Sequence, residues 1–193
     1  MSGKKIMWIV AGVVAVAAIA AALSAESGSV EAYGEVAVAG EGLPRYEAGA
    51  ADPAVGMPAP SITGETQSVM PGGTPKIVLF LAHWCPHCQR EVPRLTSWVD
   101  ANGMPDGFEL IGVATSSTPT AGNFPPSIWL ERERFPFPVI YDDEDGTAAV
   151  AYGLSAFPFW VVIDSDGNVA QRFTGELPSE AAIDQLFASA RDL

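Results

Sequence analysis

From residue 77 onward, apolar residues gather in short runs, and amphipathic stretches separate these runs. Residues 77–82 and 108–114 are mostly apolar, which predicts strands that are buried on both faces of a sheet. Between them, residues 89–101 carry large apolar side chains at helical spacing, and this pattern predicts a helix with one buried face. The chain therefore alternates between strand and helix in this region.

The remaining elements follow from the same periodicities and from the turn residues between them. They are a strand or hairpin over 61–69, a short helix within 122–134, a strand over 138–141, a short helix over 147–152, a hairpin of strands 159–164 and 169–174, and an amphipathic helix after Ser179. This order predicts an α/β fold, in which a mixed central sheet has helices on both faces.

The N-terminus has a different character. Lys4 and Lys5 precede residues 6–23, which carry no charge and are long enough to span a bilayer as a helix. We expect a signal anchor or transmembrane helix within residues 1–25, with its N-terminus in the cytoplasm. A cleaved signal peptide is the alternative, and both alternatives place the rest of the chain outside the cytoplasm.

Residues 26–55 are rich in Ala, Gly and Glu and poor in large apolar side chains. Such a composition buries too little surface to offset the entropy of ordering, so we expect a flexible stalk that leads to a domain over residues 56–193. An additional strand at residues 36–38 is the alternative.

The charge of the chain narrows its possible partners. The formal net charge is −13, and a chain this acidic cannot neutralise many phosphates, so nucleic acid is not an expected partner. We interpret the excess of acidic residues as a solvated protein surface.

The two cysteines of the chain are Cys85 and Cys88, and they follow the first buried strand directly. A disulfide between them closes too small a loop to be a useful structural crosslink, so its value must be chemical. A helix N-terminus stabilises a thiolate, and disulfides persist outside the cytoplasm. We therefore expect thiol–disulfide exchange, in which an exposed Cys85 attacks and a buried Cys88 resolves the mixed disulfide.

Several motifs around these cysteines resemble the thioredoxin superfamily, and in particular its membrane-anchored, extracytoplasmic TlpA-like branch, which includes the cytochrome c maturation thioredoxins. They are Trp84-Cys85-Pro86-His87-Cys88, Pro93 within the helix, the segment 153–158 that ends at Pro158, and the strand and turn 159–167. The resemblance implies a thioredoxin-like fold over 56–193, a cis peptide bond before Pro158 beside the disulfide, and a family insertion between 114 and 138.

The resemblance also suggests roles for neighbouring residues. Glu91 completes a CxxCxxExP pattern, which implies a carboxyl near the cysteine pair that assists proton transfer at Cys88; an exposed acid on the helix surface is the alternative. From its position, Trp84 is expected to face the substrate, with plain packing as the alternative, and His83 is expected to be an exposed loop residue. Leu79 stands where thioredoxin has a buried Asp, so no proton relay through that position is implied.

The direction of electron flow stays open. The intervening dipeptide, Pro86-His87, is the one found in DsbA-like oxidases, and an imidazole beside Cys85 favours its thiolate, which makes the disulfide more oxidising. TlpA-like proteins, in contrast, are mostly reductants. We favour an oxidising enzyme slightly, and a dedicated reductase for apocytochrome c maturation is the alternative.

No cofactor is expected besides the redox-active disulfide Cys85–Cys88, and no metal site. A copper-binding metallochaperone that uses these cysteines together with His83 and His87 is a weaker alternative. The expected partners are exported or membrane-associated proteins with thiols or disulfides, together with a membrane redox partner that recycles the pair. The expected location is the cell membrane of a bacterium, with a single pass and the catalytic domain outside the cytoplasm.

Overall fold

The computed structural model describes residues 32–193, and a mixed five-stranded sheet lies at its centre. The strands are β4 (Lys76–Leu81), β5 (Glu109–Ala114), β6 (Val139–Tyr141), β7 (Phe159–Ile163) and β8 (Val169–Thr174). Their order is β6-β5-β4-β7-β8; β4, β5 and β6 are parallel, whereas β7 is antiparallel to both β4 and β8. The predicted mixed sheet is confirmed.

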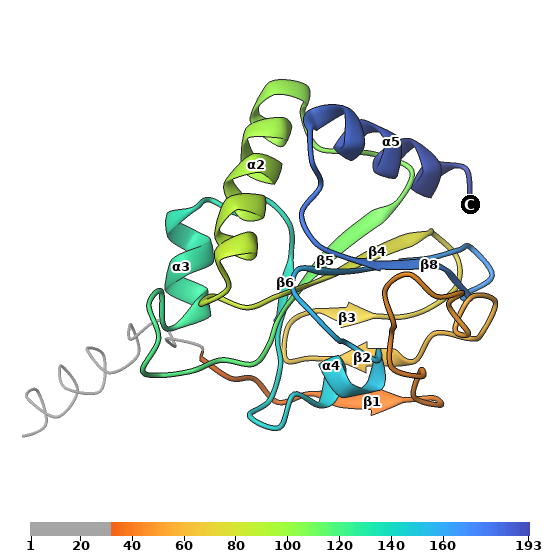
Figure 1. Ribbon diagram of the computed structural model, residues 1–193, viewed down its shortest axis with the longest axis horizontal. Coiled ribbons are helices and arrows are strands. Elements are labelled where there is room, and N and C mark those ends of the chain that lie inside the picture. The colour runs from red at the N-terminus through yellow and green to blue at the C-terminus, as the bar shows by residue number, and fades with distance from the viewer. Residues whose placement is uncertain (1–31) are drawn as a thin grey trace, which may run out of the picture. The chain divides into compact units, whose positions relative to one another are not determined.

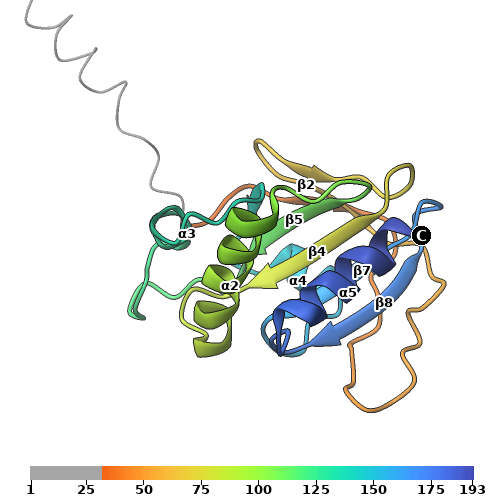
Figure 2. The same cartoon turned by 90° about the horizontal axis from the view of Figure 1, so that it is seen from above.

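Helices cover both faces of this sheet, as predicted. They are α2 (Pro86–Asn102), α3 (Pro126–Arg132), α4 (Thr147–Ala151) and α5 (Glu180–Arg191). Helices α2 and α5 lie over one face, and α4 lies on the other (Figures 1 and 2). Strand β4 supplies Leu79 and its alternate neighbours to the core under α2 and α5, while Phe80 points into the opposite core. All six residues of β4 are buried for this reason.

Helix α2 carries the residues that follow the central strand. It begins at Pro86, whose missing N–H costs nothing at the first helical position, and it continues through Pro93. The helix ends at Gly103, which has a positive φ of 83° and whose N–H donates to the carbonyl of Val99 at 2.7 Å. At the other end of the domain, the hydroxyl of Ser179 accepts from the N–H of Ala182 and caps α5.

A second, smaller sheet packs on the α4 side. It consists of β1 (Ala37–Ala39), β2 (Ser61–Thr63) and β3 (Ser68–Val69), all antiparallel. The predicted hairpin over 61–69 is β2 and β3. Strand β1 corresponds to the additional strand that was the alternative to a stalk, and Val38 pairs with Ile62 in its register.

The flexible stalk predicted over residues 26–55 is wrong for residues 32–55. Leu43 and Ala54 are buried, and the backbone N–H of Leu43 donates to the carbonyl of Ala151 at 2.8 Å. The carboxylate of Asp52 pairs with the guanidinium of Arg172, whose side chain is fully buried. Backbone hydrogen bonds and one buried ion pair therefore hold a segment whose composition alone is too polar to indicate packing. The folded domain extends N-terminal of residue 56.

The predicted membrane helix within residues 1–25 and the first part of the predicted stalk, 26–31, lie outside the described residues. Within residues 32–193, none of the helices has the length and the apolar character that crossing a membrane requires.

Candidate active site

The two cysteines lie where β4 gives way to α2. Cys85 occupies the N-cap position with an extended backbone, and Cys88 lies one turn inside the helix. Both are free thiols. Cys88 has no exposed surface, as predicted, but Cys85 is only 5% exposed, so the prediction of an exposed Cys85 is wrong in this reduced state. Cys85 belongs to the apolar core cluster that lies under α2 and α5.

The surroundings of Cys88 favour its neutral thiol. The N–H of Ala82 donates to its sulfur at 3.5 Å. Burial raises the pKa of the Cys88 thiol well above its usual range, and the neighbouring charge of Glu91 adds to this shift. A proton acceptor is therefore needed before Cys88 can attack.

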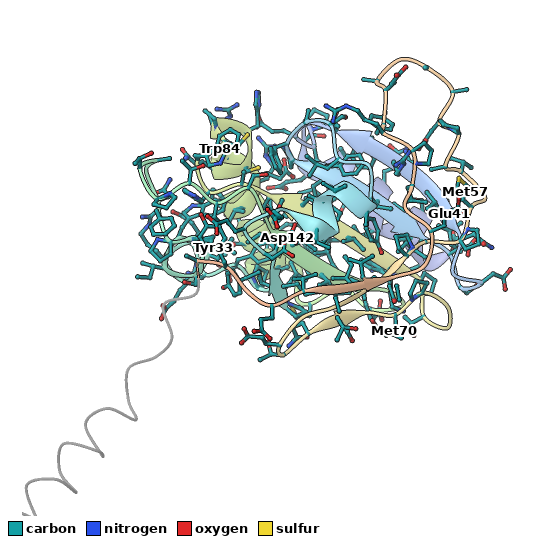
Figure 3. The ribbon with its side chains drawn as sticks, turned by 90° about the horizontal axis from the view of Figure 1, so that it is seen from below. Tyr33, Glu41, Met57, Met70, Trp84 and Asp142 are labelled. Atoms are coloured by element: carbon teal, nitrogen blue, oxygen red, sulfur yellow. The ribbon has the colours of Figure 1, made fainter. Side chains whose placement is uncertain are left out.

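Pro158 and Trp84 flank Cys85. The bond between Phe157 and Pro158 is cis, as the resemblance implied, and the carbonyl oxygen of Phe157 lies 3.9 Å from the sulfur of Cys85. The ring of Trp84 packs edge-to-face on that of Phe157 at 5.7 Å between centroids. Trp84 remains 39% exposed at the surface (Figure 3), and its indole N–H donates to the carbonyl of Ser116 at 2.8 Å. It therefore joins two chain segments while one part of it stays open to solvent.

His87 is bound to an acidic side chain from the loop between β8 and α5. Its Nδ1 lies 2.5 Å from Oε1 of Glu176, and the guanidinium of Arg90 donates to both carboxylate oxygens. Arg94 lies 3.7 Å from the same carboxylate. The hydrogen bonds from Arg90 and His87 hold the pKa of Glu176 at about 2. The His87 imidazole thus has a negative partner, which compensates positive charge near the start of α2.

Glu91 shares Arg94 with this cluster, and its side chain is fully buried. Oε2 accepts from the N–H of Leu177 at 2.9 Å and from Arg94 at 3.3 Å, while Oε1 has no hydrogen-bond partner among the described residues. Burial, the largest cause, raises the pKa of Glu91 to about 7. The alternative of an exposed surface acid is therefore wrong. Glu91 is a carboxyl that can exchange a proton near neutral pH.

His83 is buried, with 1% of its surface exposed, and the expectation of an exposed loop residue is wrong. Its ring nitrogens contact the carbonyl of Gly122 at 2.8 Å and the N–H of Thr118 at 3.0 Å. Among residues 32–193, no group of three or more His, Cys, Asp or Glu side chains is arranged to hold a metal ion. His83 in particular has no ring nitrogen left for the copper site that was the weaker alternative.

Sequence reasoning did not identify Glu176, nor the contacts of His83. Glu176 follows Gly175 at the end of a predicted strand, where an acidic residue in a loop is ordinary. One feature of the sequence could have indicated that His83 is buried: it lies between the predicted buried strand 77–82 and the Trp-Cys motif.

Comparison with known proteins places this site in a family. The family model described as Redoxin matches residues 49–187. Over 154 residues, the chain is 27% identical to the thiol:disulfide interchange protein HelX of Rhodobacter capsulatus, covering 78% of this chain and 82% of that protein. It is also 30% identical to a DsbE homolog of Paracoccus denitrificans, over 54% of this chain and about half (53%) of that protein.

Solved structures show the same fold. StoA from Bacillus subtilis superposes with a TM-score of 0.52 at 22% identity, over 65% of this chain and 88% of StoA. A thiol:disulfide interchange protein of the thioredoxin family from Chlorobium tepidum has a TM-score of 0.51 at 24% identity, over 73% of this chain and 99% of that chain. The chain belongs to the Redoxin family and is a thiol–disulfide oxidoreductase with a thioredoxin-like fold.

Proposed function

We propose that this protein exchanges disulfides with exported proteins, with Cys85 as the attacking thiol and Cys88 as the resolving thiol. The observation that carries the proposal is the placement of the two free thiols at the start of α2, with Cys85 at the N-cap beside the segment that contains cis-Pro158. A thiolate at that position meets the unpaired N–H groups of the first helical turn.

In the reducing direction, the Cys85 thiolate attacks one sulfur of a substrate disulfide and releases the other substrate sulfur as a thiolate. Cys88 then loses its proton and attacks the sulfur of Cys85, which releases the second substrate thiol. The substrate gains two electrons and two protons, and Cys85 and Cys88 become a disulfide. In the oxidising direction, the same steps run backwards.

Glu91 is the proposed proton acceptor for Cys88. A carboxyl with a pKa of about 7 can accept a proton and return it without a large barrier at neutral pH. Its Oε1 has no hydrogen-bond partner within residues 32–193, which leaves this oxygen available for that proton. His87 and Trp84 complete the proposed site, the former as a tuning group beside Cys85 and the latter as a contact for the substrate.

The proposed location is the outer face of a bacterial cell membrane, where residues 6–23 anchor the chain. Its support is the uncharged run of these residues behind Lys4 and Lys5. The pair also needs a membrane redox partner, since each turnover leaves it in the opposite redox state. No cofactor besides the cysteine pair is proposed.

The Pro86-His87 dipeptide supports an oxidising enzyme as the first candidate. A reductase, for instance for apocytochrome c, is the second candidate, and the contact between His87 and Glu176 favours it. The carboxylates of Glu176 and Glu91 add negative charge near the pair, and negative charge disfavours the thiolate form that a strong oxidant requires.

The first experiment is an equilibrium titration of the Cys85–Cys88 pair in the full chain against glutathione or dithiothreitol. A potential of about −120 mV identifies a disulfide donor, whereas about −270 mV identifies a reductase. With a peptide that contains an internal disulfide, the Cys88→Ala variant should accumulate a mixed disulfide through Cys85. The Cys85→Ala variant should form no mixed disulfide. A chain without a reversible couple would contradict thiol–disulfide exchange as its function.

A further inference from the structure

The loop over residues 116–123 follows β5 and lies beside Trp84. Ser116 and Thr118 are exposed. Ser116 and Asn123, one at each end of the loop, have positive φ values of 52° and 64°. Non-glycine residues adopt this conformation at an energetic cost, and they keep it only where surrounding contacts require it. The conformation of this loop therefore depends on its contacts with the rest of the domain.

The largest set of these contacts comes from His83. Its Nε2 accepts the N–H of Thr118 at 3.0 Å, and its Nδ1 lies 2.8 Å from the carbonyl of Gly122. A backbone N–H can only donate and a carbonyl can only accept, so Nδ1 carries the proton and the ring is neutral. The amide of Asn123 also donates to the carbonyl of His83 at 3.3 Å. One buried side chain thus fastens the loop at two points, and its own backbone adds a third.

The first residues of the loop are held from two further directions. The indole N–H of Trp84 donates to the carbonyl of Ser116, and the hydroxyl of Tyr33 donates to the carbonyl of Ser117 at 2.9 Å. Figure 3 shows Tyr33 and Trp84 at the same end of the domain. The loop therefore lies directly against the residue that precedes Cys85.

These contacts continue to the reacting sulfur. Trp84 packs on the ring of Phe157, and the carbonyl of Phe157 lies 3.9 Å from the sulfur of Cys85. Trp84 therefore contacts both the loop over 116–123 and the segment that ends at Pro158, and the second of these also contacts the sulfur of Cys85. A polypeptide bound at Cys85 therefore lies close to Trp84 and to the two segments that Trp84 contacts.

We propose that His83 is a positioning residue, which fixes loop 116–123 as one wall of the site that binds the polypeptide around the reacting cysteine. This inference rests on the proposed exchange with protein substrates. The exposed hydroxyl-bearing residues Ser116 and Thr118 can form hydrogen bonds with an extended substrate backbone, which a small disulfide lacks. His83 acts through the loop and through Trp84, and it does not touch the sulfur atoms in the described structure.

The test compares one peptide substrate with one small substrate in the full chain. The variant His83→Phe keeps a planar ring but removes both ring hydrogen bonds. The rate constant for exchange with a peptide that carries an internal disulfide should fall about tenfold, the factor that corresponds to one or two lost net hydrogen bonds. The rate with glutathione disulfide and the potential of the cysteine pair should stay unchanged. Hydrogen exchange at the Thr118 amide should become faster.

Two further variants keep the inference testable if His83→Phe folds poorly. His83→Asn retains a polar group near Nδ1, and His83→Gln retains one near Nε2, so each should lose less peptide exchange than His83→Phe. Tyr152→Phe is the matched control, because it removes another buried long-range hydrogen bond, from the Tyr152 hydroxyl to the carbonyl of Pro60 at 2.5 Å. It should leave exchange with both substrates unchanged.

The possible outcomes separate the two proposals. Selective loss of peptide exchange in the His83 variants supports the role of the loop. Equal loss with both substrates, a shifted potential, or unchanged peptide exchange overturns it. A wild-type chain that exchanges with neither substrate instead overturns the proposed function itself.

Discussion

The Oε1 atom of Glu176 lies 2.5 Å from Nδ1 of His87, although 89 residues separate the two in the chain. Arg90 binds the same carboxylate with two nitrogens, at 2.6 Å and 3.1 Å. The dipeptide between the cysteines is thus part of a charged cluster that a distant loop completes. The redox properties of the pair depend on this cluster as well as on the Pro-His dipeptide.

Glu176→Gln should make the Cys85–Cys88 pair more oxidising. The amide oxygen of glutamine can still accept a hydrogen bond from His87, but the positive charge of Arg90 loses its partner and favours a thiolate on Cys85. We expect the potential to rise by about 10–30 mV, since a tenfold change in the equilibrium constant corresponds to about 30 mV. Glu180→Gln, at an exposed position in the first turn of α5, is the control and should change nothing.

Glu91→Gln should change how stability depends on pH. The raised pKa of about 7 means that the folded state binds a proton more tightly than the unfolded chain does. The stability that this carboxyl contributes is present below about pH 4.5 and is lost as the pH rises through 7. Relative to Glu91→Gln, the reduced wild type should lose up to about 3 kcal/mol of unfolding free energy between pH 4.5 and 8. Urea titrations at both pH values measure it, and parallel pH curves would contradict it.

Asp52→Ala should destabilise the protein strongly. The side chain of Arg172 is fully buried and would lose its carboxylate partner, which typically costs about 3–5 kcal/mol. Asp100→Ala is the matched control, because the pair that Asp100 forms with Arg134 has a similar length of 2.8 Å but lies at the surface. That pair should contribute less than about 1 kcal/mol. If urea unfolding showed the same loss of unfolding free energy for both variants, the buried pair of Asp52 and Arg172 would not have the stabilising role expected here.

A chain that begins at residue 56 should be less stable than one that begins at residue 32. The shorter chain lacks β1, the buried Leu43 and the partner of Arg172. We expect a loss of at least about 3 kcal/mol, because the unpaired Arg172 alone accounts for that amount. Equal unfolding free energies would show that residues 32–55 are a stalk after all.

The main sheet could be predicted from the sequence because its elements have strong local patterns. Residues 77–82 were predicted as a central strand, and β4 covers Lys76–Leu81 between two neighbours. The predicted helix within 122–134 is α3, Pro126–Arg132. A fully apolar run or a helical spacing extends over the whole strand or helix. The type of element can therefore be predicted even where its predicted boundaries differ from the observed ones by a residue or two.

The N-terminal segment could not be predicted in this way. Leu43 and Ala54 are isolated among small and polar residues, and no period connects them. Their packing depends on backbone hydrogen bonds to the region of α4 and on the pair of Asp52 with Arg172, which lies 120 residues away. Such contacts leave no trace in local hydrophobicity.

In the candidate site, too, features that depend on local sequence could be predicted, and features that depend on distant contacts could not. Cys85, Cys88 and Glu91 are close in sequence, and their positions on one helix followed from their spacing. Glu91 accepts a hydrogen bond from the N–H of Leu177, and His83 accepts one from the N–H of Thr118, so the surroundings of both residues come from distant parts of the chain. Sequence reasoning missed the contacts that these residues make with loops far away in the chain.

The positions of Tyr33 and Leu193 have a practical consequence for handling the protein. Tyr33 is bonded to Ser117 beside the redox face, whereas the carbonyl of Leu193 accepts from the hydroxyl of Ser165. Ser165 follows β7 at the end of the sheet where β4 begins, away from the start of α2 (Figure 2). A fluorescent label, an affinity tag or a solid support attached after Leu193 therefore lies away from the start of α2 and its two cysteines. The same attachment on Tyr33 would lie against loop 116–123, which contacts Trp84.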